Sequence, residues 1–116
     1  MLEDVADETY LARINCEYND RINEYCRGRG FGLPVGFRSE REDFIQTMVA
    51  AGLGICFLPE FSATIPGVMI RPVVDPEIVR DVSLVSVAGR RFSPAVASFA
   101  RSACSYRWPK ARDEMA

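Results

Sequence analysis

The side chains best suited to chemistry in this 116-residue chain are its four cysteines, Cys16, Cys26, Cys56 and Cys104. No two of them form a C-x-x-C pair, so their spacing does not predict a metal centre or a redox motif. Cys26 falls on the apolar stripe of a predicted helix, whereas Cys16 falls in a loop near a strand end. We expect mostly reduced thiols, with Cys56 and Cys104 in the core because both lie in apolar runs.

Acid–base catalysis has few candidate groups. The chain lacks histidine, which is the commonest general base and zinc ligand. The carboxylates of Glu40, Glu42 and Asp43 cluster, but they fall in the predicted first turn of a helix, where acidic residues suit the helix dipole. No G-x-S-x-G elbow and no phosphate-binding loop occurs. We therefore predict a binding protein that is not an enzyme and has no cofactor and no metal.

Charge and hydropathy restrict the partners. The net charge is −2, and acidic and basic residues are interspersed, so no basic stripe predicts contact with nucleic acid. No apolar run is long enough to span a membrane. The acidic start, Met1 to Asp4, does not resemble a secretory signal. We expect one cytoplasmic domain that contacts neither DNA nor membrane by itself.

An anion site is predicted around Ser39. Ser39 to Glu42 has the S-x-x-E pattern of a capping box, in which Ser39 would accept from the Glu42 amide. We expect a helix that begins there and ends near Gly52. The free amides of such a helix start favour a ligand carboxylate, which Arg38 could also bind. The alternative is that Ser39 only caps the helix and Arg38 is only a surface residue.

The elements that position these residues alternate along the chain. Strands are predicted at residues 10–14, 33–37, 53–58, 68–74 and 82–87, with the third buried on both faces. Four helices are predicted. The first covers residues 2–8, the second follows an Asn19 or Asp20 cap and ends at the glycines at 28–32, and the third begins at Ser39. The last begins at Ser93-Pro94, and its apolar face carries Val96, Phe99, Ala100, Ala103 and Cys104. This alternation predicts an α/β fold with a mostly parallel sheet flanked by helices.

A family resemblance is carried by three stretches of sequence. Phe37-Arg38-Ser39-Glu40, followed by MVAAGLGICFLPE at residues 48–60, resembles the effector-binding domain of LysR-type transcriptional regulators. ADETYLARINCEYNDRINEYC at residues 6–26 resembles the opening of that domain's second subdomain. GVMIRPVVDPEIVRDVSLVSVAGRRFSPAVASFARSA at residues 67–103 resembles the crossing strand, the returning strand and the C-terminal helix of its first subdomain.

The resemblance implies a periplasmic-binding-protein-like (type 2) fold. Residues 1–66 would form the second effector-binding subdomain, residues 67–108 the last part of the first, and residues 109–116 a tail. Full members also carry a helix-turn-helix, a linker helix and the rest of the first subdomain, to which nothing in this chain corresponds. DNA contact is therefore expected only through a domain absent from this chain. A fragment and a truncated gene product both remain open.

The resemblance also implies a ligand site. Members of the family bind a small-molecule effector in the cleft between subdomains, at loops that follow strand ends, in agreement with the general rule for open α/β sheets. The matching positions are Asn15, Cys16, Glu17, Phe37, Arg38 and Ser39, and we expect a small effector, with an anion preferred. The alternatives are a stand-alone small-molecule binding module of the solute-binding fold, and a thiol redox sensor that uses Cys16 and Cys26.

Self-association is also expected from the family resemblance. If the first strands of the first subdomain's sheet are missing, the apolar residues at 82–87 lie along an unprotected edge. Such an edge recruits a further strand, and a second copy of the chain can supply it. We therefore predict a homo-oligomer, most simply a dimer, held through residues 68–106.

Overall fold

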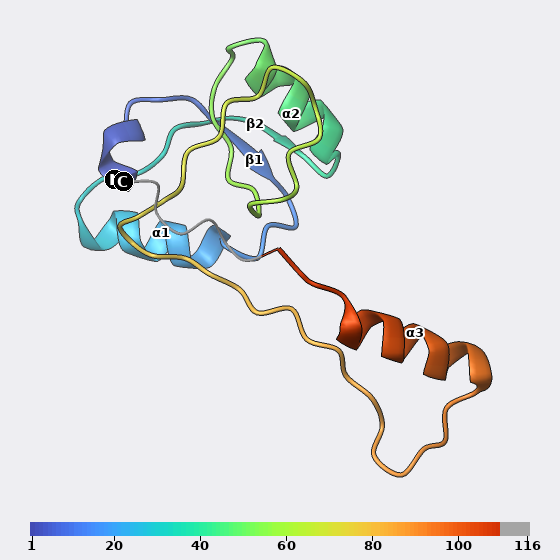
Figure 1. Cartoon of the computed structure of the whole chain (residues 1–116). Coiled ribbons are helices and arrows are strands. Elements are labelled where there is room, and N and C mark those ends of the chain that lie inside the picture. Colours follow the sequence, from blue (N-terminus) through green and yellow to red (C-terminus); the bar gives the residue numbers. More distant parts are fainter. Residues whose placement is uncertain (110–116) are drawn as a thin grey trace. The chain divides into compact units, whose positions relative to one another are not determined.

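A computed structural model describes residues 1–109, which belong to two compact units (Figure 1). The N-terminal unit is Met1–Val79, and the C-terminal unit begins at Arg80. The regular elements are the 3-10 helix η1 (Leu2–Val5), β1 (Tyr10–Arg13), α1 (Asn19–Gly28), β2 (Val35–Ser39), α2 (Glu42–Ala50) and α3 (Pro94–Ser105). Of the expected tail, residues 110–116 lie outside the described part of the chain.

The N-terminal unit is built on a small parallel sheet. β1 pairs with β2 in a register that joins Leu11 to Phe37 and Arg13 to Ser39. Figure 1 shows the two strands between α1 and α2. The predicted α/β class, with parallel strands flanked by helices, is therefore confirmed for this part of the chain.

The third predicted strand, at 53–58, is reduced to one bridge. The Leu11 amide donates to the Ile55 carbonyl at 2.8 Å, and the Ile55 amide donates to the Thr9 carbonyl at 2.9 Å. Beyond Ile55 the carbonyl of Phe57 accepts from the Arg13 side chain instead of a strand amide. The ladder ends there, so the expectation of a full strand, buried on both faces, is wrong.

The structure confirms that glycines end α1 and α2. Gly30 and Gly52 have φ angles of +78° and +80°, in the left-handed region that glycine adopts without strain. After each glycine, the next amide reaches back to the last turn: Phe31 donates to Cys26 at 3.0 Å and Leu53 donates to Met48 at 3.1 Å. Both helices therefore end in Schellman motifs.

The predicted helix starts are wrong at both positions. Ser39 is the last residue of β2, and its carbonyl accepts from the Ile14 amide at 3.1 Å. Strand pairing keeps Ser39 extended, so α2 begins three residues later, with Arg41 as N-cap. Asn19 is the first residue of α1, after the N-cap Tyr18. Its side chain binds strand β1 instead of capping the helix.

Most buried residues of the N-terminal unit lie in β1 and α2 and in a cluster between η1 and α1. Leu2, Ile22 and Cys26 form the buried cluster, which confirms Cys26 as a small apolar core residue. Ile78 packs against this cluster, and the Leu2 amide donates to the Asp75 carbonyl at 3.1 Å. Residues 67–79 thus belong to the N-terminal unit.

Two further predicted strands, at 68–74 and 82–87, are absent. Both segments are irregular, and most of their apolar side chains are exposed. A strand needs a neighbour to satisfy its backbone N–H and C=O groups. Among residues 1–109 neither segment has such a neighbour, so the β-branched composition alone does not form a strand here.

The C-terminal unit contains α3, whose start was predicted correctly. The Ser93 hydroxyl accepts from the Val96 amide at 3.3 Å, and Pro94 is the first helical residue. No residue of α3 is buried in the described part of the chain. Cys104 is exposed, contrary to its predicted core position. None of the helices described in residues 1–109 is long and apolar enough to cross a membrane.

Candidate functional site

The carboxyl ends of β1 and β2 form the candidate ligand site, because both strands run in the same direction and end at one edge. The loop after β1 carries Asn15, Cys16 and Glu17, and β2 itself ends with Phe37, Arg38 and Ser39. Cys16 is buried, Ser39 is half-buried and the other four are exposed. The fold therefore brings the two predicted groups of residues to one edge of the sheet.

Arg13 connects the chain segments that meet at this edge of the sheet. It is the last residue of β1, and only 14% of its side chain is exposed. Its guanidinium donates to the Phe57 carbonyl at 3.0 Å and to the Glu42 carboxylate at 3.3 Å, where Glu42 is the first residue of α2. It also donates to the Cys16 sulfur at 3.4 Å and lies 3.8 Å from the Glu17 carboxylate. Arg13 thus links both strand-end loops with the segment at residue 57.

The side chains of Ser39 and Arg38 lie on opposite faces of β2. Ser39 is the register partner of Arg13, and Arg38 is the partner of Ala12. Because consecutive strand residues face opposite sides, a ligand that touches both Arg38 and Ser39 must lie beyond the strand end. The Ser39 hydroxyl accepts from the Arg41 amide at 3.0 Å, and the Arg41 guanidinium is held by Asp43 at 2.6 Å.

Among residues 1–109, Arg38 forms no ion pair, unlike its two neighbours at this edge. Arg13 is neutralised by Glu17 and Glu42, and Arg41 by Asp43. The charge on the exposed Arg38 side chain is therefore the one at this edge that a dissolved anion can approach without displacing a carboxylate of the chain.

Tyr10 anchors the start of the neighbouring helix. Its hydroxyl donates to the side-chain Oδ1 of Asn19 at 3.0 Å, and the side-chain Nδ2 of Asn19 donates to the Arg13 backbone carbonyl at 3.3 Å. The ring packs on Phe57, with the ring centres 5.3 Å apart. Burial raises the pKa of Tyr10 to about 12, so its hydroxyl stays protonated and acts as a donor.

Neither Cys26 nor Cys56 has the lowered pKa that activates a redox thiol. All four cysteines are free thiols. Burial raises the pKa of Cys26, and it raises the pKa of Cys56 to about 11, so both remain thiols at neutral pH. Within residues 1–109, no three Cys, Asp or Glu side chains are grouped closely enough to hold a metal ion.

Arg13, at this edge, and Tyr10, at the opposite end of β1, were not among the predicted site residues. Arg13 is the one charged residue in the otherwise apolar run Tyr10 to Ile14, and that was the available signal. The partners of this arginine, Glu42 and Phe57, are 29 and 44 residues away in sequence. The sequence alone could not identify them.

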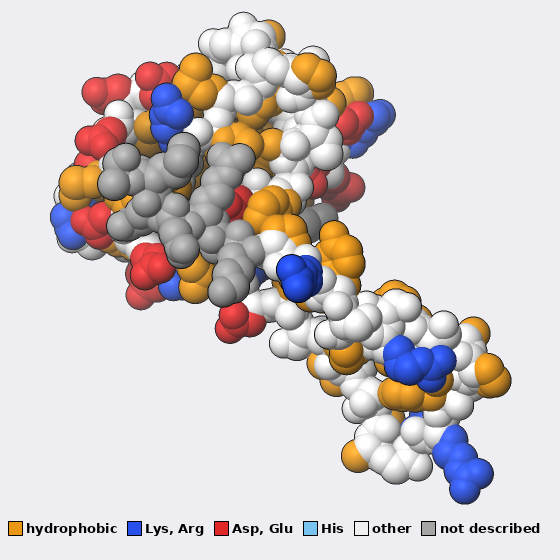
Figure 2. All heavy atoms as spheres, viewed as in Figure 1, with side chains coloured by type: hydrophobic (Ala, Val, Ile, Leu, Met, Phe, Trp, Pro, Cys, Tyr) orange, Lys and Arg blue, Asp and Glu red, His pale blue; other side chains and the backbone are white. Residues whose placement is uncertain are grey.

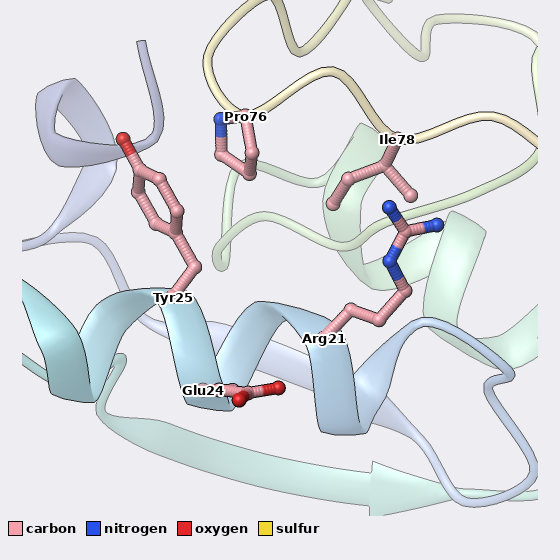
Figure 3. Close-up of a pocket in the computed structure, with 5 residues that line it drawn as sticks. All are labelled: Arg21, Glu24, Tyr25, Pro76 and Ile78. Atoms are coloured by element: carbon pink, nitrogen blue, oxygen red, sulfur yellow. The ribbon is translucent and has the colours of Figure 1, made fainter.

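A separate shallow pocket of about 270 Å³ lies on α1, lined by Arg21, Glu24, Tyr25, Pro76 and Ile78 (Figure 3). Figure 3 shows Arg21 and Tyr25 on α1, opposite Pro76 and Ile78 on the later segment. None of the six predicted ligand residues lines it. The hydroxyl oxygen of Tyr25 is buried and has no hydrogen-bond partner among residues 1–109.

The parallel sheet, the flanking helices and the loops gathered at the strand ends define a small α/β domain. Residues 1–104 match the protein family described as the LysR substrate binding domain. The chain therefore belongs to this family, and the resemblance carried by residues 6–26, 48–60 and 67–103 is confirmed.

Two curated proteins of Bacillus subtilis (strain 168) are similar to the chain. The transcriptional dual regulator GltC is 31% identical over 77 residues, which cover 64% of this chain and 26% of GltC. The uncharacterized HTH-type transcriptional regulator YwbI is 29% identical over 116 residues, which cover 97% of this chain and 38% of YwbI. The chain thus spans well under half the length of either relative. Both are described as regulators, in agreement with the prediction that the chain is not an enzyme. No solved structure matches the chain.

Proposed function

We propose that this chain is the effector-binding portion of a LysR-type transcriptional regulator and binds a small organic anion at the carboxyl ends of β1 and β2. The observation that carries the proposal is the exposed Arg38 guanidinium, which has no carboxylate partner among residues 1–109, next to two strand-end loops. Open α/β sheets bind their ligands at this edge. The family match supports a small-molecule effector.

The chemistry of the edge favours a carboxylate. An arginine binds a carboxylate through two parallel N–H···O bonds, which gives both affinity and orientation. The Ser39 hydroxyl accepts from Arg41 and keeps its own hydrogen for a ligand oxygen. Asn15 and Glu17 on the facing loop are exposed and can contact the rest of the ligand. Cys16 is buried and would support the loop between them.

The finer parts of the proposal concern the rest of the regulator. Residues 1–66 would be the second effector-binding subdomain, and residues 67–108 would complete the first. A helix-turn-helix domain outside this chain would bind DNA, and effector binding would shift the relation between the subdomains. The regulator would act in the cytoplasm as a homo-oligomer, with self-association through residues 68–106 of this chain.

Thermal unfolding with and without small carboxylates tests the anion site. We would use acetate, benzoate, succinate and citrate, each paired with the corresponding neutral amide. A carboxylate at ten times its Kd adds about 1.4 kcal/mol to the free energy of unfolding, which is a shift of about 5 °C or more in Tm. The amides should produce no shift.

Arg38→Gln should remove this stabilisation. Arg27→Gln is the matched control, because Arg27 is also exposed and unpaired within residues 1–109 but lies in the last turn of α1. The proposal predicts a shift that is lost in the first variant and kept in the second. Equal shifts in both variants, or no shift with any of the carboxylates, would contradict it.

A further inference from the structure

Arg13 is a largely buried cation whose partners come from three segments of the chain. On the face shown in Figure 2, acidic and basic side chains of the N-terminal unit reach the surface, but only 14% of the Arg13 side chain is exposed. Its guanidinium lies 3.8 Å from the Glu17 carboxylate after β1 and 3.3 Å from the Glu42 carboxylate at the start of α2. It also donates to the Phe57 carbonyl. Arg13 therefore holds the loop after β1 against the start of α2.

The two carboxylates would oppose each other without this cation. Glu17 and Glu42 approach the same guanidinium, so their charges would face each other across the space that Arg13 fills. Like charges at such a distance repel. The repulsion would drive the loop at residues 14–17 away from α2. The spacing between the two sides of the candidate site thus depends on Arg13.

Stability alone does not require an arginine at this position. A buried ion pair repays its desolvation only in part, and an apolar side chain of similar volume is often as stable. The guanidinium supplies geometry instead, because its planar fork fixes the direction of each hydrogen bond. Arg13 is already neutralised by its two carboxylates, and it faces the side of the sheet opposite to Arg38. It is therefore placed to hold the loops and not to bind the ligand.

We infer that Arg13 is a positioning residue of the effector site, which keeps the loop at residues 14–17 at the distance from α2 that a small organic anion requires. This inference rests on the proposed function. Arg13 does not touch the ligand, but it determines where Asn15 and Glu17 lie relative to Arg38 and Ser39. Losing it should weaken ligand binding even in a chain that remains folded.

Amide hydrogen exchange without ligand tests the positioning step alone. The amides of Ile14 and Asn19 close the loop at its two ends, through hydrogen bonds of 3.1 Å and 3.2 Å to backbone carbonyls. Arg13→Met should make both amides exchange at least about tenfold faster relative to the amide of Ile22, which lies in the buried cluster and reports opening of the whole unit. A general loss of stability would accelerate all three and leave the ratios unchanged.

Isothermal titration calorimetry with the four carboxylates named above, at a temperature where every variant is folded, tests the consequence for binding. Arg13→Met should raise the Kd of the tightest-binding carboxylate at least about tenfold. Arg29→Met is the matched control, because Arg29 also lies near two carboxylates, Glu3 at 2.9 Å and Asp75 at 3.9 Å, but at the opposite end of α1 from the loop. It should change neither the Kd nor the exchange ratios.

The sign of a second substitution tests whether Arg13 acts through its carboxylates. Glu42→Gln removes a partner of Arg13 in the otherwise unchanged chain, so there it should raise the Kd. In the Arg13→Met chain it removes one of the two repelling charges, so there it should lower the Kd. Equal effects in the two backgrounds would mean that Arg13 and Glu42 act independently, which contradicts the inference.

Two further results would overturn the inference. Unchanged exchange ratios in Arg13→Met would show that the loop keeps its place without the arginine. Faster loop exchange with an unchanged Kd would show that the ligand does not depend on the loop. Failure of the proposed function looks different, because the wild-type chain would then bind none of the carboxylates, and the exchange ratios would still decide whether Arg13 holds the loop.

Discussion

Gln46 holds the loop at 62–65 onto α2, and replacing it with methionine should destabilise the N-terminal unit. Gln46 is only 2% exposed. Its side-chain nitrogen donates to the Ser62 carbonyl at 2.9 Å. Its oxygen accepts from the amides of Thr64 and Ile65 at 2.9 Å and 3.2 Å. Methionine keeps a similar volume in this site but can replace none of these bonds.

The expected loss in the free energy of unfolding follows from three backbone groups that lose their hydrogen-bond partner, namely the Ser62 carbonyl and the amides of Thr64 and Ile65. A buried polar group without a hydrogen bond costs about 1–3 kcal/mol. Thr64 is exposed and Ser62 and Ile65 are half-buried, so water can reach part of the loop and the lower end of that range applies. We expect a loss of about 3 kcal/mol, which corresponds to a fall of about 12 °C or more in Tm. Gln46→Ala should cost more, because it also leaves a cavity.

Urea unfolding followed by far-UV circular dichroism measures this loss. The single tryptophan, Trp108, lies in the C-terminal unit, so its fluorescence is not the appropriate probe. Thr47→Ala is the control, because Thr47 is the next residue of α2 but is exposed. A loss below about 0.5 kcal/mol for Gln46→Met would mean that the loop does not depend on these bonds and would refute the reasoning.

Gly54→Ala should lower the free energy of unfolding by about 2 kcal/mol in the same urea assay, because the added methyl group meets the backbone carbonyl of Thr9. Ser93→Ala should reduce the helix signal of α3 in circular dichroism, because the lost cap is worth about 1 kcal/mol and no buried face supports this helix. Burial raises the pKa of the Cys56 thiol from 9.0 to about 11, so the unfolded chain loses this proton first and stability should fall as the pH rises from 9 to 11. Urea titrations across that range, with Cys56→Ala as the comparison, should show the fall in the wild-type chain and a smaller one in the variant.

The sequence by itself determined the features that depend on neighbouring residues. Gly30 and Gly52 end their helices because the left-handed turn requires glycine, whatever else surrounds it. Ser93 and Pro94 begin α3 because a cap and a proline act within one turn. Cys26 is buried because helical spacing places it on the same stripe as Ile22. The family resemblance could be recognised for the same reason, since ordered short motifs carry it.

Only the tertiary structure decided the features that need a distant partner. Ser39 has a capping sequence, yet pairing with Arg13, 26 residues earlier, keeps it in a strand. The run at 82–87 has strand composition, yet it stays irregular because no neighbour within residues 1–109 accepts its backbone hydrogen bonds. Arg13 joins both strand-end loops through Glu42 and Phe57, which lie far along the chain. Local propensity favours a conformation, but backbone groups and charges need partners that only the folded chain supplies. At Ser39 and at residues 82–87, the presence or absence of such a partner outweighed the local propensity.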